Sequence, residues 1–105
     1  MIDFYDIDHF SLRLAKLREQ AGVSARQMSL DLGQNSSYIN RIENRKALPS
    51  MQGFFYICEY LKISPKDFFD EEIIDPNKHK QLATKMKGLS PHALDVIDQL
   101  VDLVR

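Results

Sequence analysis

The sequence contains a single cysteine, Cys58, so the chain cannot form an internal disulfide. This is typical of proteins that reside in a reducing compartment. The sequence also lacks any apolar run that approaches the roughly 20 residues of a membrane-spanning helix. Its first ten residues carry acidic side chains where an export signal needs cationic ones. We therefore expect a cytoplasmic protein that has no membrane partner.

A strong net charge is lacking as well, because the formal charge is −1 and the isoelectric point is about 6.3. Bulk charge therefore does not indicate a nucleic-acid partner. The charges are nevertheless segregated along the chain. Residues 34–48 hold three cations and one acid, whereas residues 70–75 hold four acids and no cation. Any surface that binds DNA must be local, and the first of these two segments is the candidate.

Residues arranged for catalysis or metal binding are also missing. We find no nucleophile beside a base, no glycine-rich phosphate loop and no pair of carboxylates at catalytic spacing. The three histidines, His9, His79 and His92, are scattered and have no cysteine partners, which argues against a zinc site. The sequence predicts that the protein is not an enzyme and needs no cofactor, and no small-molecule ligand is evident.

No segment of useful length shows the alternating pattern of a β-strand. Apolar residues recur instead at helical spacing, and serine, proline and glycine mark where helices begin and end. We predict an all-α protein with a five-helix head at residues 8–70 and a two-helix tail at residues 71–105. The third helix should be capped by Asn35 or Ser36 and should end near Asn44.

The second and third predicted helices carry the spacing of a helix-turn-helix. Ser29 places a small side chain where two steeply crossing helices approach each other. Gly33 supplies the positive φ that a tight turn between them needs. Ile39 and Ile42 lie one turn apart and would anchor the rear of the third helix on the core. The opposite face of that helix should therefore stay exposed.

From about Leu12 to Phe69 the sequence resembles the phage repressor and Cro type of helix-turn-helix protein, also called the xenobiotic-response-element regulator family. The resemblance rests on the segments LRLAKLREQAGVSARQMSLDLG, SSYINRIENRKALPS and YLKISPKDFF. It implies a sequence-specific transcriptional regulator that binds double-stranded DNA, with a dimeric repressor as the expected form.

The resemblance also implies which residues read the bases. It places Ser36 and Ser37 in the major groove, and one helical turn further on Asn40 and Arg41 share the same exposed face. Arginine can pair with guanine, and asparagine with adenine, through two hydrogen bonds worth about 1–3 kcal/mol of discrimination. Arg41 is therefore the first candidate for base reading, followed by Asn40 and Ser37.

Contacts to the sugar-phosphate backbone are implied on both sides of the turn. The start of the second helix resembles the family's phosphate clamp, in which N–H groups and the helix dipole favour an anion. The implied backbone-contacting residues are Ser24, Arg26, Gln27, Tyr38, Asn44, Arg45 and Lys46. Two positions depart from the family pattern: Ala25 stands where glutamine is usual, and Arg45 stands where glycine is usual. At the second departure we expect either that Asn44 takes the left-handed conformation or that the helix runs one residue longer.

Several residues in this region have a structural interpretation beside the functional one. Tyr38 is interpreted equally well as a half-buried aromatic residue. Glu43 is expected to be structural, with Arg18 as its ion-pair partner inside the head. The aromatic side chains between residues 54 and 69 are expected to pack in the core rather than to stack on single-stranded bases.

The last predicted helix carries an apolar stripe so wide that it must be buried. The stripe can fold back on the head or pair with a second copy. We favour a homodimer, because operators read by the family are usually two half-sites that match a two-fold dimer. The residues expected at this interface are Leu94, Ile97, Leu100, Val101 and Val104.

A second hypothesis remains open beside DNA binding. The near-neutral charge and the two departures at Ala25 and Arg45 are compatible with a protein-interaction module that retains the helix-turn-helix fold without sequence-specific DNA binding. The two hypotheses differ in whether the protein selects a DNA sequence with salt-dependent affinity.

Overall fold

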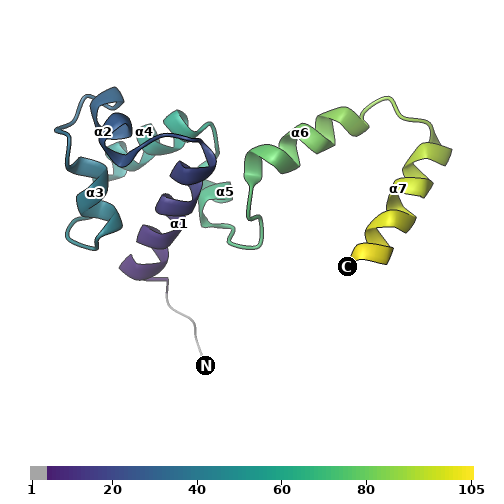
Figure 1. Ribbon diagram of the computed structural model, residues 1–105, viewed down its shortest axis with the longest axis horizontal. Helices are drawn as coiled ribbons and strands as arrows, with labels where there is room; N and C mark the ends of the chain where they lie inside the picture. Colours follow the sequence, from purple (N-terminus) through teal and green to yellow (C-terminus); the bar gives the residue numbers. More distant parts are fainter. Residues whose placement is uncertain (1–4) are drawn as a thin grey trace.

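A computed structural model describes residues 5–105, and every regular element in this part of the chain is a helix (Figure 1). The all-α prediction is therefore confirmed. Five helices form the head and two extend from it. Their bounds are α1 Ile7–Gln20, α2 Ala25–Asp31, α3 Tyr38–Glu43, α4 Met51–Leu61, α5 Pro65–Phe69, α6 Pro76–Met86 and α7 Pro91–Val104.

Most of the helices begin where a side-chain oxygen can accept a hydrogen bond from the first turn. Ser24, Ser50, Ser64 and Ser90 each accept from the backbone N–H three residues further on, at the starts of α2, α4, α5 and α7. Asp75 does the same for α6. Each bond satisfies an N–H that the helix itself leaves without a partner, and such a cap is typically worth about 1 kcal/mol.

The core of the head lies where α1 to α5 converge. Leu14, Met28, Ile57 and Phe68 are fully buried there, and burial of such side chains contributes about 1.5–3 kcal/mol each. Phe10, Phe54 and Phe68 pack against one another with ring centroids 4.9–5.8 Å apart. The buried hydrophobic cluster runs from Phe10 to Phe68, so the head assembles its core without the tail.

A buried arginine closes the C-terminal end of the head. The Arg13 guanidinium donates to the backbone carbonyls of Asp67 and Phe68 at 2.7 Å and of Asp70 at 3.0 Å. These carbonyls lie at the end of the short helix α5, where they have no partner within the helix. Arg13 therefore joins α1 to α5 and satisfies its own donors inside the protein.

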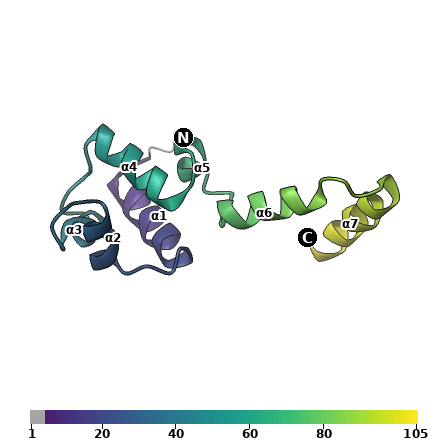
Figure 2. The same cartoon turned by 90° about the horizontal axis from the view of Figure 1, so that it is seen from above.

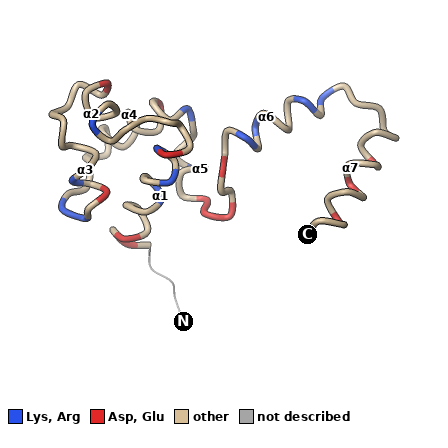
Figure 3. The backbone as a smooth tube through the Cα atoms, in the orientation of Figure 1, with Lys and Arg blue, Asp and Glu red and all other residues tan. Residues whose placement is uncertain are grey.

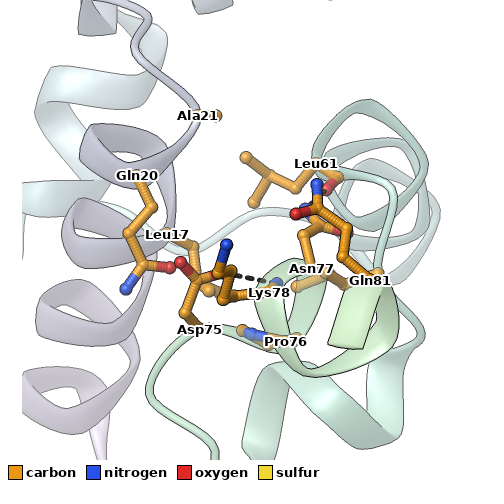
Figure 4. A pocket seen from close by; sticks show the side chains of 10 residues that line it. Leu17, Gln20, Ala21, Leu61, Asp75, Pro76, Asn77, Lys78 and Gln81 are labelled. Carbon is orange, nitrogen blue, oxygen red and sulfur yellow. Dashed lines mark hydrogen bonds between the residues drawn. The ribbon is translucent and has the colours of Figure 1, made fainter. Parts of the chain in front are cut away.

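The first turn of helix α6 anchors it to the head. Pro76 is buried, and Asn77 Nδ2 donates to the Leu61 carbonyl at 3.2 Å. Gln20 Nε2 donates to the Ile74 carbonyl at 2.8 Å, just before the helix begins. Together these groups border a small cavity of about 150 Å³ between α1, α4 and α6 (Figure 4). The remainder of α6 is exposed.

The tail extends away from the head. Figures 1 and 2 both show α6 leading outward and α7 turning away from it at an angle, so that the tail forms an open V. Gly88, with φ of 81°, lies in the bend between them. The molecule is accordingly elongated, with extents of 52 × 38 × 21 Å. Within residues 5–105, no helix combines the length and apolar character that crossing a membrane requires.

Candidate nucleic-acid interface

The turn between α2 and α3 is built around Gly33. Its φ of 73° is the left-handed conformation that glycine adopts without steric cost. The Gly33 N–H donates to the Leu30 carbonyl at 2.9 Å, and the Gln34 N–H donates to the Ser29 carbonyl at 3.0 Å. This pair of hydrogen bonds is the Schellman motif, which ends α2 and redirects the chain toward α3. The predicted role of Gly33 is confirmed.

Ser29 joins the two helices of the motif. Its side chain is fully buried. The hydroxyl donates to the Ala25 carbonyl at 2.7 Å and accepts from the Ile39 N–H at 2.9 Å. Sequence reasoning identified Ser29 only as a small residue. A serine rather than an alanine at a buried crossing point was the signal that a hydrogen bond is needed there.

The start of α3 differs from the expectation. We predicted a cap at Asn35 or Ser36, but α3 begins at Tyr38 and its flanking residue, Ser37, makes no side-chain capping bond. Asn35 Oδ1 instead accepts from the N–H and the hydroxyl of Ser37, at 3.1 and 2.8 Å. Residues 35–37 therefore form a separate turn. The helix can begin after this turn because Ser29, on α2, satisfies the Ile39 N–H.

The orientation of α3 is fixed by its apolar side. Ile39 and Ile42 are fully buried, as predicted. The Ser11 hydroxyl on α1 donates to the Ile42 carbonyl at 2.7 Å and holds the far end of the helix. As a consequence Asn40 and Arg41 lie on the exposed face, together with Ser37 in the preceding turn, while Ser36 is half-buried.

Asn40 and Arg41 differ in how free their side chains are. Across residues 5–105, no hydrogen bond or ion pair engages the Arg41 guanidinium. Asn40 instead accepts a hydrogen bond through Oδ1 from Asn44 Nδ2, which also donates to the Asn40 carbonyl at 2.8 Å. Arg41 is thus available to a ligand directly, whereas Asn40 must first exchange a partner.

The end of α3 corrects both alternatives drawn from the sequence. The helix ends at Glu43 and Asn44 keeps a negative φ of −94°, so neither an Asn44 in the left-handed conformation nor a longer helix is present. Arg45 itself adopts the left-handed conformation, with φ of 63°. Its N–H donates to the Ile42 carbonyl, and the Lys46 N–H donates to the Arg41 carbonyl. The chain therefore makes the Schellman turn usual for glycine with an arginine in the left-handed position.

Arg45 also pairs with an acid at the start of α1. Its Nε lies 2.5 Å from Asp8 Oδ1, and both side chains are largely exposed. Figure 3 shows cationic residues at the end of α3 and acidic residues at the start of α1. Lys46 is exposed beside Arg45. The local positive charge near α3 is therefore partly offset by Asp8.

Tyr38 occupies the half-buried environment that was one of its two interpretations. It packs against the hydrophobic core, and burial raises the pKa of its phenol. A Cβ atom at Gly53 would lie only 2.9 Å from the Tyr38 hydroxyl oxygen, so the glycine in α4 leaves the space that this hydroxyl occupies. The hydroxyl thus points to the start of α4.

The first turn of α2 presents Ser24, Arg26 and Gln27, all exposed. Ser24 Oγ accepts from the Gln27 N–H at 3.0 Å, which is the capping bond of α2. The Gln27 side chain donates to Asp31 Oδ1, and the Tyr60 hydroxyl donates to Asp31 Oδ2, both at 2.7 Å. Both bonds lower the pKa of the Asp31 carboxyl, and the bond from Tyr60 has the larger effect. The network was not anticipated from sequence, since Tyr60 lies two helices away.

These features define a helix-turn-helix protein: a small buried residue where two helices cross, a turn with a left-handed glycine, and a short helix with one buried and one polar face. A family model described as a helix-turn-helix domain matches residues 12–72, more than half of the chain. The chain therefore belongs to the helix-turn-helix domain family.

The comparison with solved structures agrees with this assignment. The chain is similar to the restriction-modification controller protein C.AhdI from Aeromonas hydrophila, with 26% identity and a TM-score of 0.57 over 61% of this chain and 93% of that one. A search of curated proteins finds no significant match. The family and the structural likeness support a DNA-binding regulator of transcription and point away from an enzyme.

Proposed function

We propose that this protein is a sequence-specific transcriptional regulator of the phage repressor and Cro type, which binds double-stranded DNA as a dimeric repressor. Residues 36–41 would read the major groove. The observation that carries the proposal is the arrangement of α3: Ile39 and Ile42 are buried, and Asn40 and Arg41 are presented on the opposite, exposed face.

The base-reading residues would contribute unequally. Arg41 is free of intramolecular partners in the described chain, so its guanidinium can donate to both acceptors of a guanine without losing an existing bond. Asn40 would have to give up its bond with Asn44 before it could bind adenine with both amide groups. Ser36 and Ser37 precede the helix in a turn and would approach the groove with hydroxyls, which discriminate less between bases.

Contacts to phosphates would set the register of α3 in the groove without carrying sequence information. We assign them to the first turn of α2 and to the residues that follow α3. Arg45 would exchange Asp8 for a phosphate, because an exposed ion pair of this kind is worth less than about 1 kcal/mol. The assigned residues are Ser24, Arg26, Gln27, Tyr38, Asn44, Arg45 and Lys46.

We further propose a division of labour between residues 8–70, which bind DNA, and residues 71–105, which dimerise. The exposed apolar side chains of α7 support this division. Leu103 is 81% and Val104 is 76% exposed, an arrangement that a protein in water tolerates poorly without a partner. Leu94, Ile97, Leu100 and Val101 would complete the interface with Val104.

The rival function is a protein-interaction module that uses the helix-turn-helix fold without reading DNA. The pairing of Arg45 with Asp8 favours it, because this pairing reduces the positive charge that a DNA surface needs. Selection from a pool of random duplexes, repeated at several salt concentrations, distinguishes the two. A regulator enriches one motif and loses affinity linearly in log salt. If no motif is enriched and the affinity does not depend on salt, the protein-interaction module is favoured instead.

A further inference from the structure

The tail presents two exposed apolar stripes rather than one. On α6, Leu82 and Met86 lie one turn apart and are 47% and 37% exposed. On α7 no residue is buried, and the apolar side chains occupy about half of the helix circumference when counted at about 100° per residue. The two helices of one chain diverge in an open V, so neither stripe covers the other (Figure 1).

The two helices also carry opposite charges. Helix α6 contains Lys78, Lys80 and Lys85 and no acid. Helix α7 contains Asp95, Asp98 and Asp102 and no lysine or arginine within its bounds. Figure 3 shows this separation along the tail, with cations on α6 and acids on α7.

On each tail helix, part of the charged row borders one edge of the apolar stripe. On α6, Lys78 and Lys85 are four residues before and three residues after Leu82, so they border it on the helix surface. On α7, Asp98 is four residues after Leu94 and three residues before Val101, and it borders both in the same way. Lys80, Asp95 and Asp102 lie further round their helices. A contact that buries the stripes along these edges would therefore bring Lys78 and Lys85 close to Asp98 at its rim.

A pairing of α7 with a second α7 along this edge would instead place the Asp98 carboxylates of the two copies beside each other. Like charges at such a rim disfavour the contact, whereas lysines on α6 would complement the aspartates. The width of the α7 stripe adds a second argument. One neighbouring helix covers a stripe of roughly 100°, so α7 needs two neighbours, and its own chain offers only the narrow stripe of α6.

We propose that the occupant of these stripes is the tail of a second copy, with α7 of each copy packed into the V of the other. The edge of α7 that carries Leu94, Asp98 and Val101 would meet α6 of the partner. The remaining apolar residues, among them Leu100 and Leu103, would meet α7 of the partner. This inference rests on the proposed dimer and specifies how it is built.

Charge reversal in the full-length protein tests this arrangement. One variant replaces the rim acid of α7 (Asp98→Lys), and a second replaces the rim cations of α6 (Lys78→Glu, Lys85→Glu). Sedimentation velocity at moderate salt should show that each variant alone dimerises roughly 10-fold or more weakly than the unaltered chain, because several rim pairs become repulsive together. An equimolar mixture should recover the dimer.

A matched control reverses two exposed cations of the head, Lys16→Glu with Lys66→Glu, and should leave dimerisation unchanged. Far-UV circular dichroism checks that each variant keeps its helices. The proposal is overturned if the α6 variant dimerises as the unaltered chain does, if the mixture recovers no dimer, or if the unaltered chain is monomeric. Sedimentation tests the arrangement of the tail, whereas selection from random duplexes tests DNA recognition by the head. A failure of one proposal can therefore be distinguished from a failure of the other.

Discussion

The Arg18 guanidinium binds the Glu43 carboxylate at two points, with 2.7 Å from Nε to Oε2 and 2.9 Å from Nη2 to Oε1. The third arm of the guanidinium, Nη1, donates to the Val23 carbonyl at 2.8 Å. The hydrogen bond with Glu43 raises the pKa of Arg18 further above its ordinary value. This confirms the expected partner of Glu43. The pair joins the last turn of α3 to the end of α1 and so helps to fix the orientation of the exposed face of α3.

Glu43→Gln should destabilise the head, because the amide keeps the shape of the side chain but loses the charge-assisted bonds. The pair is only 15% and 13% exposed, which limits screening by water. Hydrogen bonds to charged groups are worth about 1.5–3 kcal/mol, and we expect a loss in that range. Urea denaturation measures it, with Glu59→Gln on the exposed side of α4 as the control. A loss no larger than that of the control would contradict the role given to the pair.

Ser29→Ala should also destabilise the head, chiefly through the loss of the hydrogen bond that joins α2 to α3. The substitution removes the oxygen that accepts from the Ile39 N–H and leaves this donor buried without a partner. An unsatisfied buried donor costs about 1–3 kcal/mol. Ser37→Ala, in the exposed turn before α3, serves as the control and should change the free energy of unfolding much less. Equal effects of the two substitutions would show that the Ser29 hydroxyl does not hold α3.

Arg45→Gly and Lys62→Gly should separate backbone strain from DNA contact. Both residues adopt the left-handed backbone conformation, with φ of 63° at Arg45 and 59° at Lys62. Relief of that conformation is worth about 1–2 kcal/mol. The extra flexibility of glycine in the unfolded chain costs about 0.5–1 kcal/mol, so each variant should gain between about 0 and 1.5 kcal/mol of unfolding free energy in thermal or urea denaturation.

DNA affinity should distinguish the same two variants. Lys62 ends α4 and borders a hollow beside α6, so Lys62→Gly should bind DNA as the unaltered protein does. Arg45→Gly should bind more weakly on every duplex, and the slope of log affinity against log salt should fall by about 1. Unchanged binding by Arg45→Gly would remove Arg45 from the set of phosphate contacts.

Cys58 should make the stability of the head fall at alkaline pH. Burial raises the pKa of its thiol to about 11, from an ordinary value of 9.0. Because the folded pKa is the higher one, the stabilisation is complete below pH 9 and is lost as the pH rises from 9 to 11. Urea denaturation at pH 8 and pH 10.5 should show a steeper loss for the unaltered protein than for Cys58→Ala. Parallel losses would mean that the thiol ionises as readily in the folded state.

The sequence predicted those parts of the fold that depend on local signals. Serines before helices, glycines after them and the spacing of Ile39 and Ile42 each act within a few residues, so the helices of the head and the buried side of α3 followed from the pattern. The two-helix tail was anticipated for the same reason, since Ser90 and Pro91 mark the start of α7 independently of any neighbour.

The remaining features depend on partners distant in the sequence. Asn44 was a reasonable left-handed residue, but its side chain bonds to Asn40 within the helix and the left-handed position falls on Arg45. The start of α3 shifted to Tyr38 because Ser29 on another helix supplies the hydrogen bond that a cap would have made. A single sequence does not reveal such long-range bonds.

The most direct test of DNA reading by α3 compares Arg41→Ala with Lys46→Ala on a selected duplex and on a scrambled one. Arg41→Ala should cost about 1–3 kcal/mol on the selected duplex, little on the scrambled one, and should relax the preference at one base position. Lys46→Ala should weaken binding to both equally. If Arg41→Ala also weakens both duplexes equally, with no base position relaxed, α3 does not read the sequence as proposed.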